Sequence, residues 1–233
     1  MMYVFILAGV GSLGLIFLMH YFLFQALTHF FGITGQIYLN TLKISLILLP
    51  FGFILASILI TRFSNIFVRF FYTAAAGWFG VMLYLVLACL SAYFIIYLSK
   101  IFSFSLNEKA LITGLFLAAA AVIIYGIIGA QNIKIKELPI ALPNLPAEWQ
   151  GKTAIFISDL HLGAIDNYEF ANRVAGRIDD LKPDLLFIGG DFFDGQANVD
   201  LDKLAQIFST VKTPWGKFFV TGNHEEFGHK EKS

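Results

Sequence analysis

Three stretches of sequence decide the fold: TAIFISDLH at residues 153–161, LLFIGGDFFD at 185–194 and KFFVTGNHE at 217–225. Each begins with a short apolar run rich in β-branched and aromatic residues, which predicts strands over 153–158, 185–189 and 217–221. Helical patterns separate these runs. Continuous apolar strands that alternate with helices predict a parallel sheet covered by helices.

The segments between the strands have the spacing of amphipathic helices. In the first, apolar residues recur at every third or fourth position behind Asn167, whose side chain can cap a helix. The second ends at Pro214 and Gly216, which stop a helix before the third strand. The apolar positions are Phe170, Val174, Ile178 and Leu181 in the first segment, and Leu204, Ile207, Phe208 and Val211 in the second.

Polar residues of similar chemistry follow each of the three apolar runs. In an open parallel sheet the carboxyl ends of the strands meet at one edge, and binding sites form there. Carboxylate, imidazole and amide ligands without a thiolate suit Mn, Fe, Zn or Mg rather than a structural zinc site. The sequence therefore predicts a metal site at this edge from Asp159, His161, Asp191, Asn223 and His224, with Asp194 nearby.

Three motifs in these stretches resemble the signature of the calcineurin-like metallophosphoesterases. The signature is Asp-x-His, then Gly-Asp-x-x-Asp, then Gly-Asn-His followed by Asp or Glu, and residues 159–161, 190–194 and 222–225 match it. The resemblance extends over about residues 152–228. It implies an α/β fold that is the first half of a four-layer αββα sandwich, with hydrolysis of a phosphate ester or pyrophosphate as the activity.

The resemblance also implies a role for each residue at the site. Asp159 and His161 would bind a first divalent metal ion, and Asp191 would bridge it to a second. Asn223 would bind the second ion through its side-chain carbonyl. His224 would stabilise the phosphoryl transition state or protonate the leaving oxygen. Two such ions lie about 3.5–4 Å apart and activate a water for in-line attack on phosphorus.

Two further residues are assigned by the same resemblance. Asp194 would orient the Asp191 loop or a ligand rather than bind metal. Family members have more metal-binding histidines after the Gly-Asn-His motif, including a late Gly-His-x-His. Here only His229 follows, and we expect it to be a disordered tail residue rather than a metal ligand.

The α/β part, about 100 residues, is close to half the length that the sandwich needs. We therefore expect this chain to carry the first half of the catalytic domain and to leave one sheet face and an edge strand uncovered. On this interpretation, residues 1–233 alone would insert into membranes but would be nearly inactive with manganese.

The first 133 residues have a different character, because they hold only six of the 32 charges: Lys43, Arg62, Arg69, Lys100, Glu108 and Lys109. A membrane-spanning helix needs about 20 mainly apolar residues. The charge-free stretches predict an α-helical membrane bundle of four spans near residues 3–24, 44–60, 73–98 and 110–129, the first uncleaved. We expect His20 and His29 to be interfacial polar residues at the end of the first span.

Composition agrees with this division into a membrane part and a water-soluble part. Hydrophobic residues make up 58% and charged residues 14%, with a mean hydropathy of +0.73. Soluble domains usually have about 45–50% apolar residues and about 25% charged residues. Disorder, collagen and disulfide scaffolds are excluded. Cys89 is the one cysteine, so no intramolecular disulfide can form. Net charge is zero, and no nucleic-acid partner is indicated.

Domain boundaries follow from these patterns. Residues 1–130 are expected to form a transmembrane anchor, similar in architecture to the multi-span anchors of some bacterial family members. Residues 131–151 contain three prolines and form an extended linker, and 152–233 form the partial metallophosphoesterase domain. The partners expected are the lipid bilayer and a phosphorylated substrate, either a small molecule or lipid-linked.

Two other function classes are alternatives to the enzyme. The absence of charges from the middle of the spans argues against a pump or proton-coupled transporter. An incomplete ligand set favours a non-catalytic membrane protein with a degenerate metal- or partner-binding domain.

Counting cations near the span ends gives four on the side of the termini (Arg62, Arg69, Lys134, Lys136) and three opposite (Lys43, Lys100, Lys109). The positive-inside rule then predicts a cytoplasmic α/β domain on the bacterial cell membrane.

Overall fold

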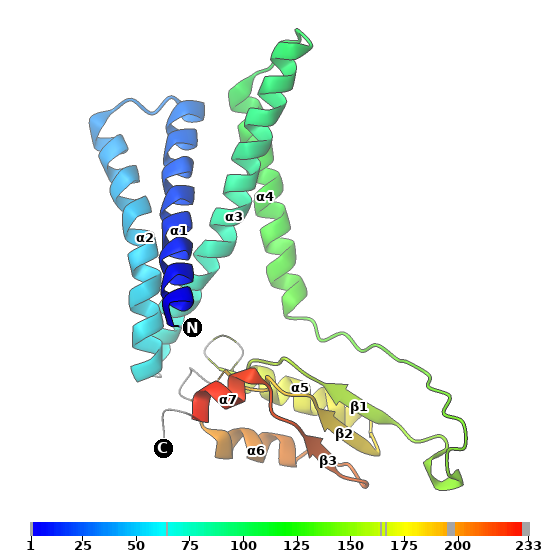
Figure 1. Ribbon diagram of the computed structural model, residues 1–233. Coiled ribbons are helices and arrows are strands. Elements are labelled where there is room, and N and C mark those ends of the chain that lie inside the picture. The colour runs from blue at the N-terminus through cyan, green and yellow to red at the C-terminus, as the bar shows by residue number, and fades with distance from the viewer. Residues whose placement is uncertain (1, 64, 164, 166, 195–198, 230–233) are drawn as a thin grey trace. The chain divides into compact units, whose positions relative to one another are not determined.

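The computed structural model describes residues 2–63, 65–163, 165, 167–194 and 199–229, with side chains from residue 9 to residue 226 within these ranges. The chain divides into two compact units. One consists of Met1–Ser57 and Ala74–Asn132, and the other of Ile58–Thr73 and Ile133–Ser233. Long helices make up the first part of the chain, and a small α/β arrangement makes up the last part (Figure 1).

Four long apolar helices precede the α/β region: α1 (Met2–Phe31), α2 (Gln36–Arg62), α3 (Ile66–Ile101) and α4 (Glu108–Ala130). Each contains a stretch that is long and apolar enough to cross a membrane, with a hydropathy between 1.7 and 2.5. Helices suit a bilayer because they satisfy every backbone hydrogen bond internally. The prediction of a four-helix membrane region is confirmed.

The observed helices are longer than the charge-free stretches suggested. The helix predicted to begin at Ile44 begins at Gln36, so Lys43 lies inside α2, and α3 begins at Ile66, before Arg69. A long cationic side chain can stay in a helix near its end because the flexible stem reaches the headgroup region. Charge therefore marks where a span approaches the interface, whereas hydrogen bonding decides where the helix ends.

His20 is buried and not interfacial, so the prediction for this residue is wrong. Its side chain is 2% exposed. The Trp78 Nε1–H of α3 donates to His20 Nε2 at 3.0 Å, and His20 Nδ1 lies 2.8 Å from the Ile16 carbonyl oxygen. A buried polar ring needs such partners because an unpaired one is costly to desolvate. His29, by contrast, is exposed in the last turn of α1 and lies 3.7 Å from the Glu108 carboxylate.

The α/β region is built on one parallel sheet. Strands β1 (Ala154–Ile157), β2 (Leu185–Ile188) and β3 (Lys217–Phe219) lie in the order β1-β2-β3, and both pairs are parallel. Helix α5 (Tyr168–Asp180) connects β1 to β2, and α6 (Leu201–Ser209) connects β2 to β3 (Figure 1). The predicted alternation of strands and helices is confirmed.

Both connecting helices pack on the same face of the sheet. The Asn167 side chain caps α5 by accepting from the Glu169 and Phe170 amides, as predicted, and Asp200 caps α6. The strand residues alternate between faces. Leu186 and Ile188 point into the core. The buried members of that core are Leu162, Ala171, Val174, Ala175, Ile178, Leu186, Ile188, Phe192, Leu204, Ile207, Phe208 and Val211.

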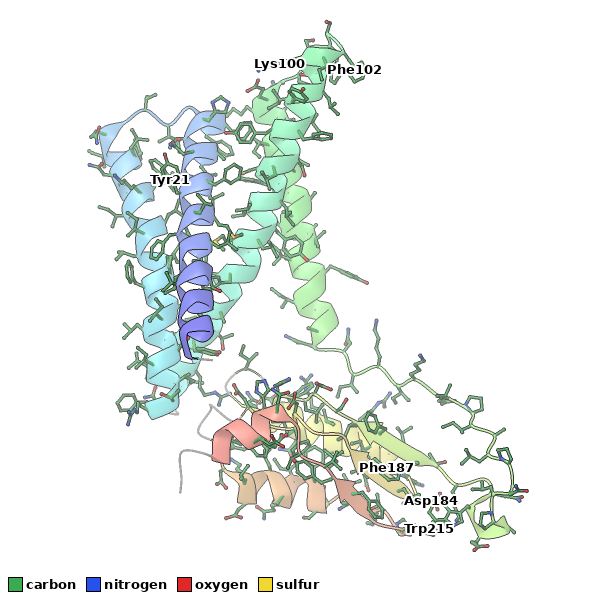
Figure 2. All side chains as sticks on the ribbon, viewed as in Figure 1. Tyr21, Lys100, Phe102, Asp184, Phe187 and Trp215 are labelled. Carbon is green, nitrogen blue, oxygen red and sulfur yellow. The ribbon has the colours of Figure 1, made fainter. Side chains whose placement is uncertain are left out.

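The opposite face of the sheet carries a row of three phenylalanines. Phe156, Phe187 and Phe218 occupy paired positions across the three strands and are 67%, 38% and 51% exposed. The Phe187 and Phe218 rings stack at 5.5 Å (Figure 2 labels Phe187). As expected from the sequence, one face of the sheet is left open within the described chain.

Asp184 fastens the amino-terminal edge of the sheet. Its carboxylate accepts from Lys152 Nζ at 3.1 Å and from the Thr153 amide at 3.0 Å, and its carbonyl oxygen accepts from the Trp215 amide at 2.9 Å. Figure 2 shows Asp184 beside Trp215, and Trp149 packs edge-on against Trp215 at 4.5 Å. The Thr153 hydrogen bond, followed by the Lys152 contact, holds the pKa of Asp184 below its usual value.

A short helix follows β3. Asn223–His229 form this helix, α7, so the prediction that His229 is a disordered tail residue is wrong for its backbone. The first residue of α7 is Asn223, a residue type that favours helix starts. The side chain of His229 lies outside the described side chains. Between α4 and β1 lies the 3-10 turn η1 (Ala147–Trp149).

Candidate metal centre

The loops that follow β1 and β2 run side by side at the carboxyl edge of the sheet. The ladder of backbone hydrogen bonds continues past the strands, because the Asp159 amide donates to the Gly190 carbonyl at 3.1 Å and the His161 amide donates to the Asp191 carbonyl at 2.9 Å. This continuation brings the Asp-x-His and Gly-Asp motifs together, although they are about thirty residues apart in sequence.

Three of the predicted site residues have left-handed backbones. The φ angles are 56° at Asp159, 43° at His161 and 47° at Asp191. Side chains other than glycine rarely adopt this region, and it carries a cost that persists only where the surroundings fix the conformation. The paired loops supply such surroundings. These three are half of the six described non-glycine residues with a positive φ, and all three belong to the motifs.

Three of the predicted residues bring ligand atoms into one group. One donor atom each from His161, Asp191 and His224 lies within 4.8 Å of the other two, and all three side chains are half-buried. The His161 and His224 rings meet edge-on at 4.4 Å. Two imidazoles and a carboxylate are a donor set that suits divalent Mn, Fe or Zn. The residues present therefore fit a metal ion.

The other two predicted ligands, Asp159 and Asn223, are not among these three residues. Asp159 is exposed and is not a member of the group, although its amide binds the neighbouring loop. Asn223 is exposed and is the first residue of α7, which begins four residues after the end of β3. The structure thus groups His224, which the sequence suggested as the catalytic residue, with two of the four residues suggested as ligands.

His224 contacts both aspartates of the Gly-Asp-x-x-Asp motif. Its backbone amide donates to Asp191 Oδ1 at 3.0 Å. Its ring Nδ1 lies 3.8 Å from Asp194 Oδ1. The Asp194 carboxylate is therefore close enough to bias the orientation of the His224 ring.

Glu225 is the residue whose position the sequence did not reveal. Its side chain is 2% exposed, and its carboxylate accepts hydrogen bonds from four backbone amides, those of Asp191, Phe192, Phe193 and Gly222. Burial by itself raises the pKa of Glu225, but the four amide donors outweigh it and hold the pKa below its usual value. The one sequence signal was the acidic fourth position of the Gly-Asn-His-Glu motif.

Two glycines allow the loops to approach this closely. A Cβ added to Gly190, whose φ is 88°, would lie 2.7 Å from the Gly222 nitrogen. A Cβ added to Gly222 would overlap the Asp191 carboxylate. Backbone therefore packs directly on backbone here, which explains why both motifs place glycine before the polar residue.

Comparison with known proteins identifies the α/β segment. The family model described as calcineurin-like phosphoesterase matches residues 152–233. A "Transmembrane protein with metallophosphoesterase domain" from Danio rerio is 29% identical over 128 residues, which is 52% of this chain and 29% of that protein. An uncharacterized metallophosphoesterase from Aquifex aeolicus is 37% identical over 98 residues, covering 41% of this chain and 36% of its own length.

A third relative has a more specific name. The "UDP-2,3-diacylglucosamine pyrophosphatase LpxG" from Chlamydia muridarum is 30% identical over 93 residues, covering 40% of this chain and 28% of that protein. No solved structure matches the chain. The chain thus spans about a third of the length of these relatives. On the motifs, the sheet and these matches, residues 152–233 are similar to the calcineurin-like phosphoesterases, a family of metal-dependent hydrolases, and in this chain they follow four membrane-type helices.

Proposed function

We propose that this chain is part of a membrane-anchored phosphoesterase that uses two divalent metal ions to hydrolyse a phosphate ester or pyrophosphate bond. The observation that carries the proposal is the group of His161, Asp191 and His224 at the carboxyl edge of a parallel sheet. In this proposal residues 1–130 anchor the protein in the membrane. Residues 131–151 link this anchor to residues 152–233, which contribute to the catalytic domain.

The ligand roles follow the motif order. Asp159 and His161 would hold one ion, Asp191 would contact both ions, and Asn223 would bind the second. When bound, divalent cations supply charge neutralisation for the phosphoryl oxygens and activation of water at neutral pH. The left-handed backbones at Asp159, His161 and Asp191 support this assignment, because strain of this kind collects where side chains must be aimed.

His224 is proposed to act on the substrate rather than solely on metal. Its ring lies against His161 and within 3.8 Å of Asp194. In this arrangement Asp194 orients the imidazole, and His224 would donate a hydrogen bond or a proton to the leaving oxygen. The His224 ring also lies in the group with His161 and Asp191. His224→Ala therefore tests its role toward the substrate and its role toward metal together.

The substrate class is proposed from a relative and from the anchor. The Chlamydia relative is named a pyrophosphatase of a diacylated sugar nucleotide. Four membrane-type helices in this chain would keep the site near lipid-linked phosphates. A lipid-linked pyrophosphate is therefore the first substrate to try, ahead of soluble phosphomonoesters and phosphodiesters. The excess of one cation beside the termini supports a cytoplasmic α/β domain on a bacterial cell membrane.

The proposal is tested by expressing the gene of this protein, purifying the product in detergent and measuring its hydrolysis of phosphate compounds. We expect manganese-dependent release of phosphate from a nitrophenyl phosphate ester, or of nucleotide from a diacylated sugar nucleotide. His224→Ala should abolish turnover, whereas Glu226→Gln, at an exposed neighbouring position, should leave it unchanged. Tight manganese binding without turnover on either substrate would favour the non-catalytic alternative.

A further inference from the structure

The Glu225 carboxylate joins two loops that are thirty residues apart in sequence. From the loop after β2 it accepts the amides of Asp191 at 2.9 Å, Phe192 at 2.7 Å and Phe193 at 3.2 Å. From the loop before α7 it accepts the Gly222 amide at 2.6 Å. One side chain therefore fixes the backbone on both sides of the proposed metal ligands Asp191 and Asn223.

The three successive amides of residues 191–193 point at one carboxylate. Consecutive amides that follow a left-handed residue form a concave anion site, and Asp191, with φ 47°, is such a residue. Here the anion is internal, because Glu225 fills the concavity with a side chain that is 2% exposed.

An ionised carboxylate is the group that this position requires. Four donors converge on two oxygens, and a carboxylate offers only acceptors, with about four lone-pair positions. A glutamine of the same shape would present its amide hydrogens to at least one of the backbone donors and leave it unpaired. The neighbouring Glu226 is exposed, so it provides a matched control of the same chemistry.

We infer that Glu225 is a positioning residue that locks the Asp191 loop to the Gly222–His224 turn and so holds the metal ligands in place before any metal arrives. The inference deepens the proposed function and rests on it for the identity of the ligands. It makes a separate physical claim: the two loops are mechanically coupled through one side chain, in the metal-free protein.

The coupling can be measured by hydrogen–deuterium exchange of the full chain in detergent without metal. In Glu225→Gln we expect faster amide exchange in both peptides, residues 190–194 and 221–226, while residues of α5 keep their protection. Glu226→Gln should leave both peptides as in the unmodified chain. Titration with Mn²⁺, followed by the electron paramagnetic resonance signal of the free ion, should give about 10–100-fold weaker binding in Glu225→Gln alone.

Other results of these measurements would contradict either the coupling of the two loops or the proposed function. Faster exchange confined to residues 221–226, or in neither peptide, would overturn the lock. If α5 also loses protection in Glu225→Gln, the shorter Glu225→Asp is measured in the same way, and loss of α5 protection there too would replace the local role with a general one in folding. If the unmodified chain binds no Mn²⁺ but the exchange pattern is as expected, the lock stands and the proposed function fails.

Discussion

Asp191 occupies the most demanding position at the scale of single residues. Its backbone is left-handed, its carbonyl accepts from His161, and its carboxylate accepts from the His224 amide. If it bridges two ions, Asp191→Asn removes charge from both of them. We expect this variant of the gene product to lose far more activity than Asp194→Asn, whose loss should be about 10–100-fold. Equal losses in nitrophenyl phosphate hydrolysis would contradict the bridging role.

Close backbone packing makes a second prediction for single residues. Gly190→Ala would place a methyl group 2.7 Å from the Gly222 nitrogen, on a backbone with φ 88°, so the two loops must separate. We expect weaker Mn²⁺ binding and a lower unfolding midpoint. Gly176→Ala is the control, since it lies in the interior of α5 with nothing within 4 Å of the added carbon. That change should stabilise the domain by about 0.5–1 kcal/mol.

At the scale of elements, the sheet depends on Asp184 at its amino-terminal edge. Because hydrogen bonds from Thr153 and Lys152 lower the pKa of Asp184, the folded state binds this proton less readily than the unfolded chain. The stabilisation is therefore present above the ordinary Asp pKa of about 3.9 and is lost as the pH falls through the lower, folded pKa.

The corresponding variant is Asp184→Asn, followed by the fluorescence of Trp149 and Trp215 in urea. We expect a lower unfolding midpoint than the unmodified chain at pH 7, and a gap that narrows when the pH is taken below about 4. Asp180→Asn, an exposed position 4.0 Å from Arg177, should show almost no gap at either pH. A gap that stays constant with pH would show that Asp184 acts through shape rather than charge.

The elements that the sequence predicted well are those with a local pattern. The three strands and the Asn167 cap were found to within one or two residues, because apolar runs and capping side chains act on their immediate neighbours. The residues of the site were predicted from their place after the strands. Their left-handed backbones and the role of Glu225 were not, because both depend on a second loop about thirty residues away. The burial of His20 similarly depends on Trp78, fifty-eight positions later.

At the scale of the whole molecule, charge separates a part suited to lipid from a part suited to water. The four membrane-type helices hold apolar side chains outward, and their shared core includes Leu23, Met82 and Cys89. The α/β part has its own core and one open aromatic face. Because four is an even number of spans, the chain before α1 and the chain after α4 should lie on the same side of the membrane.

Orientation can be tested with single cysteines, since the natural Cys89 is fully buried and can be replaced by alanine. Ser105, in the turn between α3 and α4, and Ser209, at the end of α6, are both exposed. With the α/β domain in the cytoplasm, a membrane-impermeant maleimide added to intact spheroplasts should label Ser105→Cys and should leave Ser209→Cys unlabelled until the membrane is permeabilised. This expectation depends on four cations near the span ends on the side of the termini against three on the opposite side. One lysine added on the α3–α4 turn would make the two counts equal. The reverse labelling pattern would place the metal site outside the cell membrane, where the substrates available to it would be a different set of phosphates.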